Sequence, residues 1–322
     1  MKIEHILAGF IPETRGRDGL ALAVLLARQA GARLTVAHVH PPAWPTPGPG
    51  KVDAEWRAYI TAQAAQALQQ ARLALADVRD VPIDYVLEAD RGSGRGLVRL
   101  AGRLGADAVV IGSAPRGARS RIALGSTADQ LLHASPVPVA LAPRGYAEDH
   151  PPAIRRLAVA YRRGPASDDA VRPAVEIAAA LGAPLHLITL VVSRGMRVKA
   201  AEQTLDRLRE RAAADLREAA RGCGVEVTTQ VLEGGDVAAA LGGAECEGAL
   251  LVCASSTTGP LRRVFLGDTS MKIIRASGCP VMMLPRTPPP RPAEPAGSAR
   301  GAMPSGTATH GAVSPMRDNC GL

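Results

Sequence analysis

The chain has 322 residues, 47% of them hydrophobic, and this length suits two domains of ordinary size better than one. Only 2% of the residues are aromatic, which excludes the aromatic platforms that stack the bases of single-stranded nucleic acid. The formal net charge is +8, but the basic residues are scattered along the chain. The charge therefore disfavours a nucleic-acid-binding protein and remains compatible with a phosphorylated small molecule as ligand.

Five cysteines occur without a CxxC pair, a usage that is typical of proteins in a reducing compartment. The N-terminal stretch MKIEHILAGF has the pattern of a strand and lacks a long apolar run with a cleavage site. No apolar run reaches the ~18 residues that are needed to span a bilayer. We therefore expect a cytoplasmic protein that is not anchored in a membrane.

Short apolar runs alternate along the chain with longer helical patterns. The runs predict strands at residues 5–10, 33–39, 83–89, 107–113 and 136–142, and again at 156–161, 184–192, 225–233, 248–254 and 280–285. Near-continuous apolar runs are typical of parallel strands that are buried on both faces. After the first run, Leu22, Leu25, Leu26 and Gln29 fall on one helical stripe. This alternation predicts an α/β fold with doubly wound parallel sheets.

One unit of roughly 140 residues occurs twice along the chain. Residues 124–139, LGSTADQLLHASPVPV, and residues 266–281, LGDTSMKIIRASGCPV, share a Leu-Gly pair, a Thr, an Ala-Ser pair and a final Pro-Val. Each unit contains five of the predicted strands. We therefore predict two tandem five-stranded domains, one at residues 1–145 and one at residues 154–285.

The last predicted strand of each unit contains a proline, Pro138 or Pro280. Proline lacks the N–H that a central strand donates, so each of these strands belongs at the edge of its sheet. Residues 286–322 are rich in Pro, Gly and Ala with few large apolar side chains, and we expect a disordered tail there. A shorter Pro-rich insert at 41–50 is expected to form a mobile flap near the strand ends.

The segment IGSAPRGARSRIALGS, at residues 111–126, follows the fourth predicted strand and ends in a Gly-Ser pair before the next helix. Together with the tandem repeat, it resembles the phosphate loop of the universal stress protein family. The resemblance covers residues 2–143 and 154–285. It implies Rossmann-like domains, a nucleotide such as ATP or AMP as ligand, and fifth strands that pair with each other, here between the two halves of one chain. A further homodimer is left open.

In the first half, the resemblance assigns a phosphate loop and two positions that contact the base. The loop residues are Gly112, Ser113, Arg116, Gly125, Ser126 and Thr127, and the base-contacting positions are Ile11 and Val39. Ile11 stands where nucleotide-binding members have an aspartate, and Pro115 stands at the second glycine. Pro115 removes an N–H donor, which Arg116, Arg119 and Arg121 are expected to offset in part through charge-assisted bonds. We therefore expect weak or altered nucleotide recognition.

The second half departs further from the family pattern. Tyr161 occupies the aspartate position, and Ala254 and Thr257 replace the loop glycines. Asp268 replaces the serine at the helix start, where its carboxylate would repel a phosphate and cap the helix itself. These replacements predict a degenerate second site that does not bind nucleotide.

Three functions stay open at this point. The first is a stress-response protein that binds a nucleotide or another phosphorylated ligand in its first half alone. The second is an interaction module of the same family that binds no nucleotide and acts through its surfaces and tail. The third is an enzyme such as a slow ATPase, for which the sequence offers no acid, base or metal ligands at suitable spacing. We therefore predict no catalytic residue, no metal site and no enzymatic activity.

Overall fold

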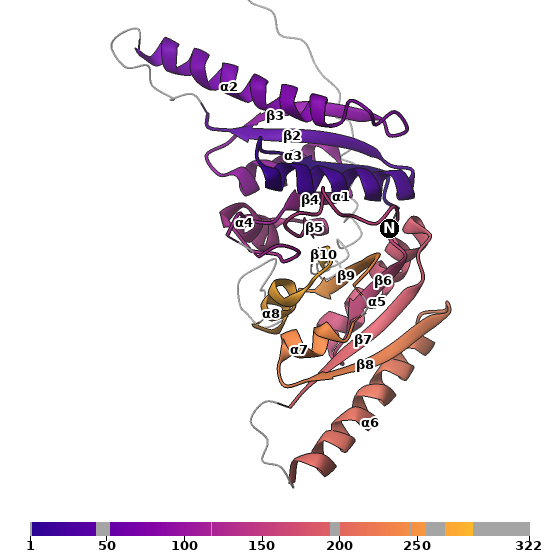
Figure 1. The fold of residues 1–322 in the computed structure, drawn as a ribbon. Helices are drawn as coiled ribbons and strands as arrows, with labels where there is room; N and C mark the ends of the chain where they lie inside the picture. The colour runs from indigo at the N-terminus through magenta and orange to yellow at the C-terminus, as the bar shows by residue number, and fades with distance from the viewer. Residues whose placement is uncertain are drawn as a thin grey trace, which may run out of the picture. The chain divides into compact units, whose positions relative to one another are not determined.

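The helices and strands of the computed structural model follow the alternation that the sequence predicts (Figure 1). The structure describes residues 2–42, 52–116, 118–193, 200–244, 246–255 and 268–285. The predicted tail at 286–322 and most of the predicted flap at 41–50 lie outside these ranges. The bounds predicted for the two domains stay a prediction.

Each half repeats one order of elements. The first half contains β1 (His5–Gly9), α1 (Thr14–Ala30), β2 (Arg33–His40), α2 (Val52–Ala74), β3 (Ile83–Ala89), α3 (Ser93–Leu104), β4 (Ala108–Gly112), α4 (Ser126–Ala134) and β5 (Val139–Ala142). The second half contains β6 (Arg156–Ala160), α5 (Pro165–Leu181), β7 (Leu185–Val192), α6 (Ala200–Arg221), β8 (Val227–Gly234), α7 (Val237–Gly242), β9 (Ala249–Ala254), α8 (Asp268–Ala276) and β10 (Val281–Leu284).

The strands of both halves form one sheet, in the order β3-β2-β1-β4-β5-β10-β9-β6-β7-β8. Within each half the neighbouring strands are parallel. The chain winds outward in one direction from β1 and then returns to wind in the other direction, and it does the same from β6. This arrangement is the doubly wound α/β fold, and the predicted fold class is confirmed.

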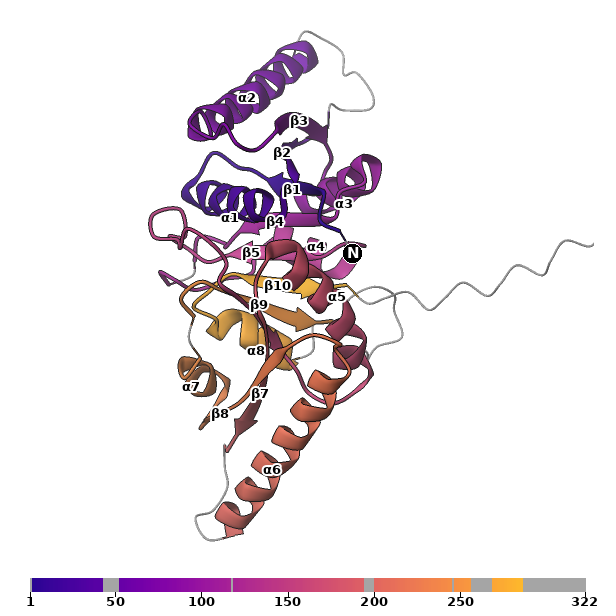
Figure 2. The same cartoon turned by 90° about the vertical axis from the view of Figure 1, so that its right-hand side faces the viewer.

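Helices cover both faces of the sheet, and Figure 2 shows α1 and α3 on opposite sides of the first-half strands. One buried cluster joins α1, α2, α5 and α6 to one face, to which Ile6, Ala140 and Met282 contribute. A second cluster joins α3, α4, α7 and α8 to the other face, with Leu7 and Val281. Successive strand residues point to opposite faces, so both faces require apolar side chains. This requirement explains the near-continuous apolar runs.

The two halves meet where β5 pairs with β10 in antiparallel orientation. Val281 lies opposite Leu141, Met282 opposite Ala140, and Met283 opposite Val139 in this pairing, and all six are buried. Pro138 and Pro280 lie just before the paired residues, where their carbonyls accept hydrogen bonds of 2.9 Å from the N–H groups of Val109 and Leu251. The missing N–H of each proline therefore costs no bond between β5 and β10. The predicted pairing of the fifth strands is confirmed.

Polar contacts of α1 add to this junction. Gln29, at the end of the apolar stripe of α1, reaches the second half, where its Nε2 donates to the carbonyls of Ile154 and Leu181 at 3.0 and 2.9 Å. Its Oε1 accepts from the Ile154 N–H at 2.6 Å. The buried Asp18 accepts from the N–H groups of Gly145 and Ala147 at 3.0 and 2.9 Å. The helix thereby holds the segment that links the halves.

We predict that Gln29→Ala lowers the free energy of unfolding by about 1–3 kcal/mol, because it leaves buried backbone groups of the second half without partners. The measurement is urea denaturation followed by far-UV circular dichroism. The neighbouring Arg28→Ala serves as the control, because it removes an exposed ion pair with Asp80 inside the first half and should cost less. Equal losses for the two variants would contradict this role of Gln29.

Candidate functional site

A cleft of about 260 Å³ opens at the carboxyl ends of β1 and β4 in the first half. We call it the first-half cleft, and its walls are Gly9, Phe10, Ile11, Arg15, Gly16, Ala37, His38, Val39, Ser93, Leu97, Ile111, Gly112, Ser126 and Thr127. The lining residues come from strand ends and from the first turns of α1, α3 and α4. A crevice outside the carboxyl ends, at the point where the winding reverses, is where doubly wound sheets bind ligands.

The N-termini of two helices lie next to each other at one side of the cleft. α3 begins at Ser93 and α4 at Ser126, after the N-cap residues Gly92 and Gly125, which have no side chain to cap the helix. In α3, Gln130 Oε1 of α4 accepts from the Arg95 N–H at 3.1 Å, so this first-turn N–H is not available to a ligand. The hydroxyls of Ser93 and Thr127 are hydrogen-bonded at 2.5 Å, which fixes the two starts side by side. Uncapped first-turn N–H groups and the positive end of the helix dipole together favour an anion.

Gly112 is required at the end of β4 because of a backbone contact. A Cβ placed on Gly112 would lie 1.8 Å from the carbonyl oxygen of Arg15. Gly19 has the same function on the helix side of this contact, since its Cβ would lie 2.8 Å from the N atom of Gly112. The first turn of α1 can therefore lie against β4. This close approach brings Arg15 into the wall of the cleft.

Gly125 precedes α4 with a φ of −108° and a ψ of 179°, an extended conformation that any residue adopts. A Cβ there would meet only the Cβ of Ala114, at 3.2 Å. Gly125 is thus not required by backbone conformation. Gly125 is the N-cap residue of α4 and does not line the cleft.

The loop between β4 and α4 closes on itself. Ser113 is buried, and its Oγ accepts from the Ala123 N–H at 2.8 Å, while the Ala114 N–H donates to the Ala123 carbonyl, also at 2.8 Å. The structure therefore uses the Ser113 hydroxyl to hold the loop and does not place it in the cleft. Pro115 and Arg116 lie in an exposed turn beyond this closure, and neither lines the cleft.

The other two loop arginines make contacts elsewhere. Arg119 forms an ion pair of 2.8 Å with Glu148 in the segment that links the halves. Arg121 donates from Nη1 to the carbonyl of Ala276, the last residue of α8, at 2.6 Å. The expectation that these two guanidinium groups offset Pro115 is therefore wrong. The N–H that proline lacks belongs to the exposed turn and not to the cleft.

The apolar wall of the cleft includes Ile11 and Val39, the two positions assigned to a base. Glu13, the nearest carboxylate in sequence to Ile11, lies 2.9 Å from Arg15 Nε and does not line the cleft. His38 lies beside Val39, and its Nδ1 is 3.0 Å from the carbonyl oxygen of Phe10. Burial lowers the pKa of His38. A neutral His38 that donates from Nδ1 to Phe10 keeps Nε2 as an acceptor.

Arg15, Ser93 and His38 line the cleft but were not among the sequence-predicted site residues. Arg15 and Ser93 lie in the first turns of helices that follow different strands. The sequence signal that could have found them is position, because first turns that follow the strands at a topological switch point converge on one crevice. His38 carried a signal as well, because it stands next to Val39 at the end of a predicted strand.

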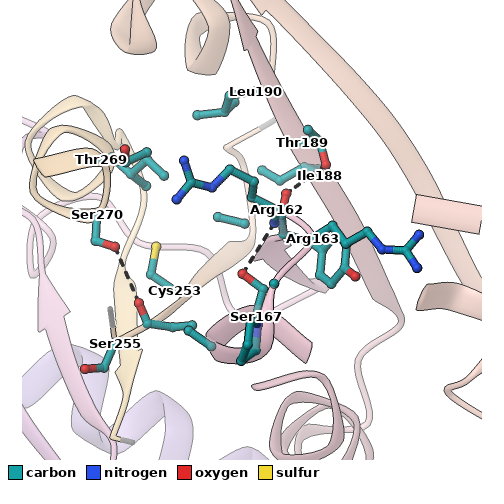
Figure 3. A pocket seen from close by; sticks show the side chains of 17 residues that line it. Arg162, Arg163, Ser167, Ile188, Thr189, Leu190, Cys253, Ser255, Thr269 and Ser270 are labelled. Carbon is teal, nitrogen blue, oxygen red and sulfur yellow. Dashed lines mark hydrogen bonds between the residues drawn. The ribbon is translucent and has the colours of Figure 1, made fainter. Parts of the chain in front are cut away.

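The second half has a cavity of about 290 Å³ at the equivalent strand ends (Figure 3). Arg162 extends toward Thr269 there, and Ser270 donates from Oγ to the carbonyl of Ala254 at 3.4 Å. Cys253 also lines the cavity, and burial raises its pKa to about 12. The size of this cavity does not distinguish it from the first-half cleft. The predicted loss of nucleotide binding must therefore come from its chemistry.

Tyr161, at the aspartate position of the second half, is buried, and its hydroxyl donates to the Asp168 carboxylate at 2.6 Å. α8 begins at Asp268, as predicted, but the Asp268 side chain and Thr257 lie outside the described residues. The capping role of Asp268 and the degenerate character of this site therefore stay predictions.

Among the described residues, no group of three or more His, Cys, Asp or Glu side chains is arranged to hold a metal ion. In the same part of the chain, no helix combines the length and the apolar character that crossing a bilayer requires.

We predict that Gly112→Ala destabilises the fold by about 1–3 kcal/mol, because its Cβ would overlap the backbone of α1. The matched control is Gly102→Ala inside α3, where a Cβ meets nothing within 4 Å and should stabilise by about 0.5–1 kcal/mol. Chemical denaturation measures both variants. Equal stabilities would show that α1 does not approach β4 as closely as described.

Comparisons with known proteins agree with this fold. The model of the Universal stress protein family matches residues 2–143 and 153–285. Universal stress proteins of Mycobacterium tuberculosis (strain H37Rv) and Mycobacterium bovis are each 37% identical over 291 residues, covering 87% of this chain and 99% of theirs. A crystal structure of a universal stress protein from Archaeoglobus fulgidus has a TM-score of 0.54 at 18% identity, covering 88% of this chain and 99% of that one. The chain therefore belongs to the universal stress protein family.

Proposed function

We propose that the first-half cleft binds a nucleotide or another small phosphorylated ligand. The observation that supports this most strongly is the uncapped start of α4, which opens into the cleft through Ser126 and Thr127. The first turn of α3 adds Ser93, and α1 adds Arg15, whose guanidinium is also paired with Glu13 at 2.9 Å. Hydroxyls, helix N–H groups and one guanidinium together suit a phosphate.

The remaining walls would receive the base or another apolar part of the ligand. Ile11, Val39 and Leu97 offer apolar contacts, and His38 offers an acceptor at Nε2. None of the described lining residues carries a carboxylate that could accept from ribose hydroxyls. Losing such a bond costs on the order of 1–3 kcal/mol, or about ten- to hundred-fold in affinity. We therefore expect ATP or AMP to bind weakly in this cleft.

The size of the cleft points the same way. Its volume of about 260 Å³ lies just below the ~300–1,000 Å³ that is typical of ligand pockets. A ligand as large as ATP would extend beyond the described walls. A mononucleotide or a smaller phosphorylated compound is the better fit.

The alternative is an interaction module that binds no nucleotide. Its support is the isoleucine at position 11, together with the engagement of Arg119 and Arg121 in contacts outside the cleft. A slow ATPase has less support, because the described lining residues include no carboxylate that could act as a base. A cytoplasmic location and a homodimer of the whole chain stay predictions.

We predict that Gly125→Asp abolishes a ligand-induced thermal shift in the full-length protein, while Gly125→Asn reduces it less. The backbone conformation at Gly125 suits both residues, and the new Cβ would make one tight contact, 3.2 Å from the Cβ of Ala114, so both variants should fold. Both side chains can cap α4. Only aspartate places a negative charge where the phosphate would lie. The shift is measured with ATP, AMP and cyclic AMP by scanning fluorimetry, and calorimetry gives the affinity.

Loss of binding with aspartate and its partial retention with asparagine would support a phosphate at the start of α4. An unchanged shift in Gly125→Asp would refute this position for the ligand. If none of the three nucleotides shifts the wild-type protein, the interaction-module alternative stands. Phosphate release followed over hours with the wild-type chain tests the ATPase alternative.

A further inference from the structure

Two cysteines lie close together in the second half, at the amino ends of its strands. The second-half cavity lies at the carboxyl ends of the same strands. Cys246 lies between α7 and β9, and Cys279 lies just before β10. β9 and β10 are parallel neighbours in which Val281 lies opposite Leu251, so the segments that lead into them run side by side. The Cys246 carbonyl accepts from the Ala249 N–H at 3.1 Å, which fixes its segment at the start of β9.

The two cysteine side chains lie close together. Cys246 packs against the backbone just before Cys279, where a Cβ placed on Gly278 would lie 3.7 Å from Cys246 Sγ and 4.0 Å from Cys246 Cβ. Ser277 Oγ lies 3.4 Å from Cys279 Sγ on the inner side. Cys279 is buried with 5% of its surface exposed, whereas Cys246 is only half-buried. The pair therefore has an outer thiol that a small solute can reach and an inner thiol behind it.

The surroundings separate the two thiols electrostatically. The hydrogen bond from Cys279 holds the pKa of Cys246 below its usual range against the opposing effect of burial. A backbone hydrogen bond from Gly278 and the charges of Arg121 and Arg156 act in the same direction. The pKa of Cys279 is raised well above its usual range by its bond to Cys246 and by burial. These surroundings favour the thiolate on Cys246 and the protonated thiol on Cys279.

We propose that Cys246 and Cys279 form a thiol pair that hydrogen peroxide or a small organic hydroperoxide oxidises to a disulfide. The Cys246 thiolate attacks one peroxide oxygen, the O–O bond breaks, and Cys246 becomes a sulfenic acid as hydroxide leaves. The Cys279 sulfur then attacks Cys246 Sγ, which expels the sulfenic oxygen with the Cys279 proton as water. Both sulfurs are oxidised by one electron. With hydrogen peroxide, the leaving hydroxide takes up the proton that the Cys246 thiol had released, and two waters form. With an organic hydroperoxide, the leaving group is the alkoxide, and one alcohol and one water form.

Other cysteines lack this combination. Cys223 is half-buried, but burial raises its pKa, and its Sγ donates to the Ala219 carbonyl at 3.3 Å. Cys253 is buried with 1% of its surface exposed. Cys320 lies outside the described residues. Of the cysteines that the structure describes, Cys246 alone combines access, a favoured thiolate and a neighbouring thiol.

Arg121 brings the first half into this site. It comes from the loop between β4 and α4, donates to the carbonyl of Ala276, and would lie 3.4 Å from a Cβ on Gly278. Removing its charge should make the Cys246 thiolate less favourable, and the oxidation should slow in Arg121→Ala. Arg116→Ala, an exposed arginine of the same loop, is the matched control and should leave the rate unchanged.

The experiment uses the full-length reduced protein at pH 7 with limiting hydrogen peroxide, followed by alkylation, digestion and mass spectrometry. We expect a Cys246–Cys279 peptide pair that is two hydrogens lighter than the separate peptides. The free thiol of Cys246 should disappear roughly tenfold faster than the free thiol of Cys223. In Cys279→Ser, dimedone should trap the sulfenic acid on Cys246, and in Cys246→Ser, Cys279 should stay reduced.

The peptide map of the wild-type protein does not depend on whether any variant folds. It can therefore refute the proposal without the variants. Oxidation of Cys223 or Cys320 as fast as Cys246 would overturn it. Oxidation of Cys246 without a bond to Cys279 would overturn the role of the second thiol. Neither result depends on whether the first-half cleft binds a nucleotide.

Discussion

The antiparallel pairing of β5 with β10 determines the organisation of the whole molecule. Each half alone would expose a fully apolar edge strand. The pairing of β5 with β10 gives the free backbone N–H and C=O groups of both strands hydrogen-bond partners. Because β5 and β10 run in opposite directions, the carboxyl ends of the first-half strands lie on the same side of the sheet as the amino ends of the second-half strands. The first-half cleft and the second-half cavity therefore open at opposite edges of one continuous sheet.

This geometry explains why the loop between β4 and α4 serves both halves. The loop leaves the carboxyl end of β4, and the amino edge of the second half lies next to it, so Arg121 can reach the end of α8. The same edge holds Cys246 and Cys279 beside the entrances to β9 and β10. A chain that duplicates a doubly wound α/β unit thus gains contacts between the β4–α4 loop of the first copy and the amino ends of the strands of the second copy. Arg121 therefore has a function in joining the two halves that does not involve a phosphate.

The strands could be predicted closely, because parallel strands buried on both faces leave apolar runs such as 107–113, which contains β4 with its first four residues buried. Pro138 and Pro280 predicted that the fifth strand lies at the edge of each half, and the resemblance to the universal stress protein family predicted that these strands pair. The cleft could be predicted only in part. Gly112 and Ser126 lie in its wall, but Arg15 reaches it through a close helix approach that pairs residues distant in sequence. Ser113 was misplaced, because a serine beside a glycine loop has the same pattern whether it binds a ligand or closes the loop.

Hydrogen exchange at the junction tests the central claim most directly. The carbonyls of Pro138 and Pro280 face β4 and β9, so by strand alternation the amides of Val139, Leu141, Val281 and Met283 face the partner strand. The pairing predicts that these four amides exchange only through global unfolding, as slowly as the amides of β1 and β6. Exchange that is much faster at these four, while β1 and β6 stay protected, would show that the halves separate without unfolding and would contradict the account.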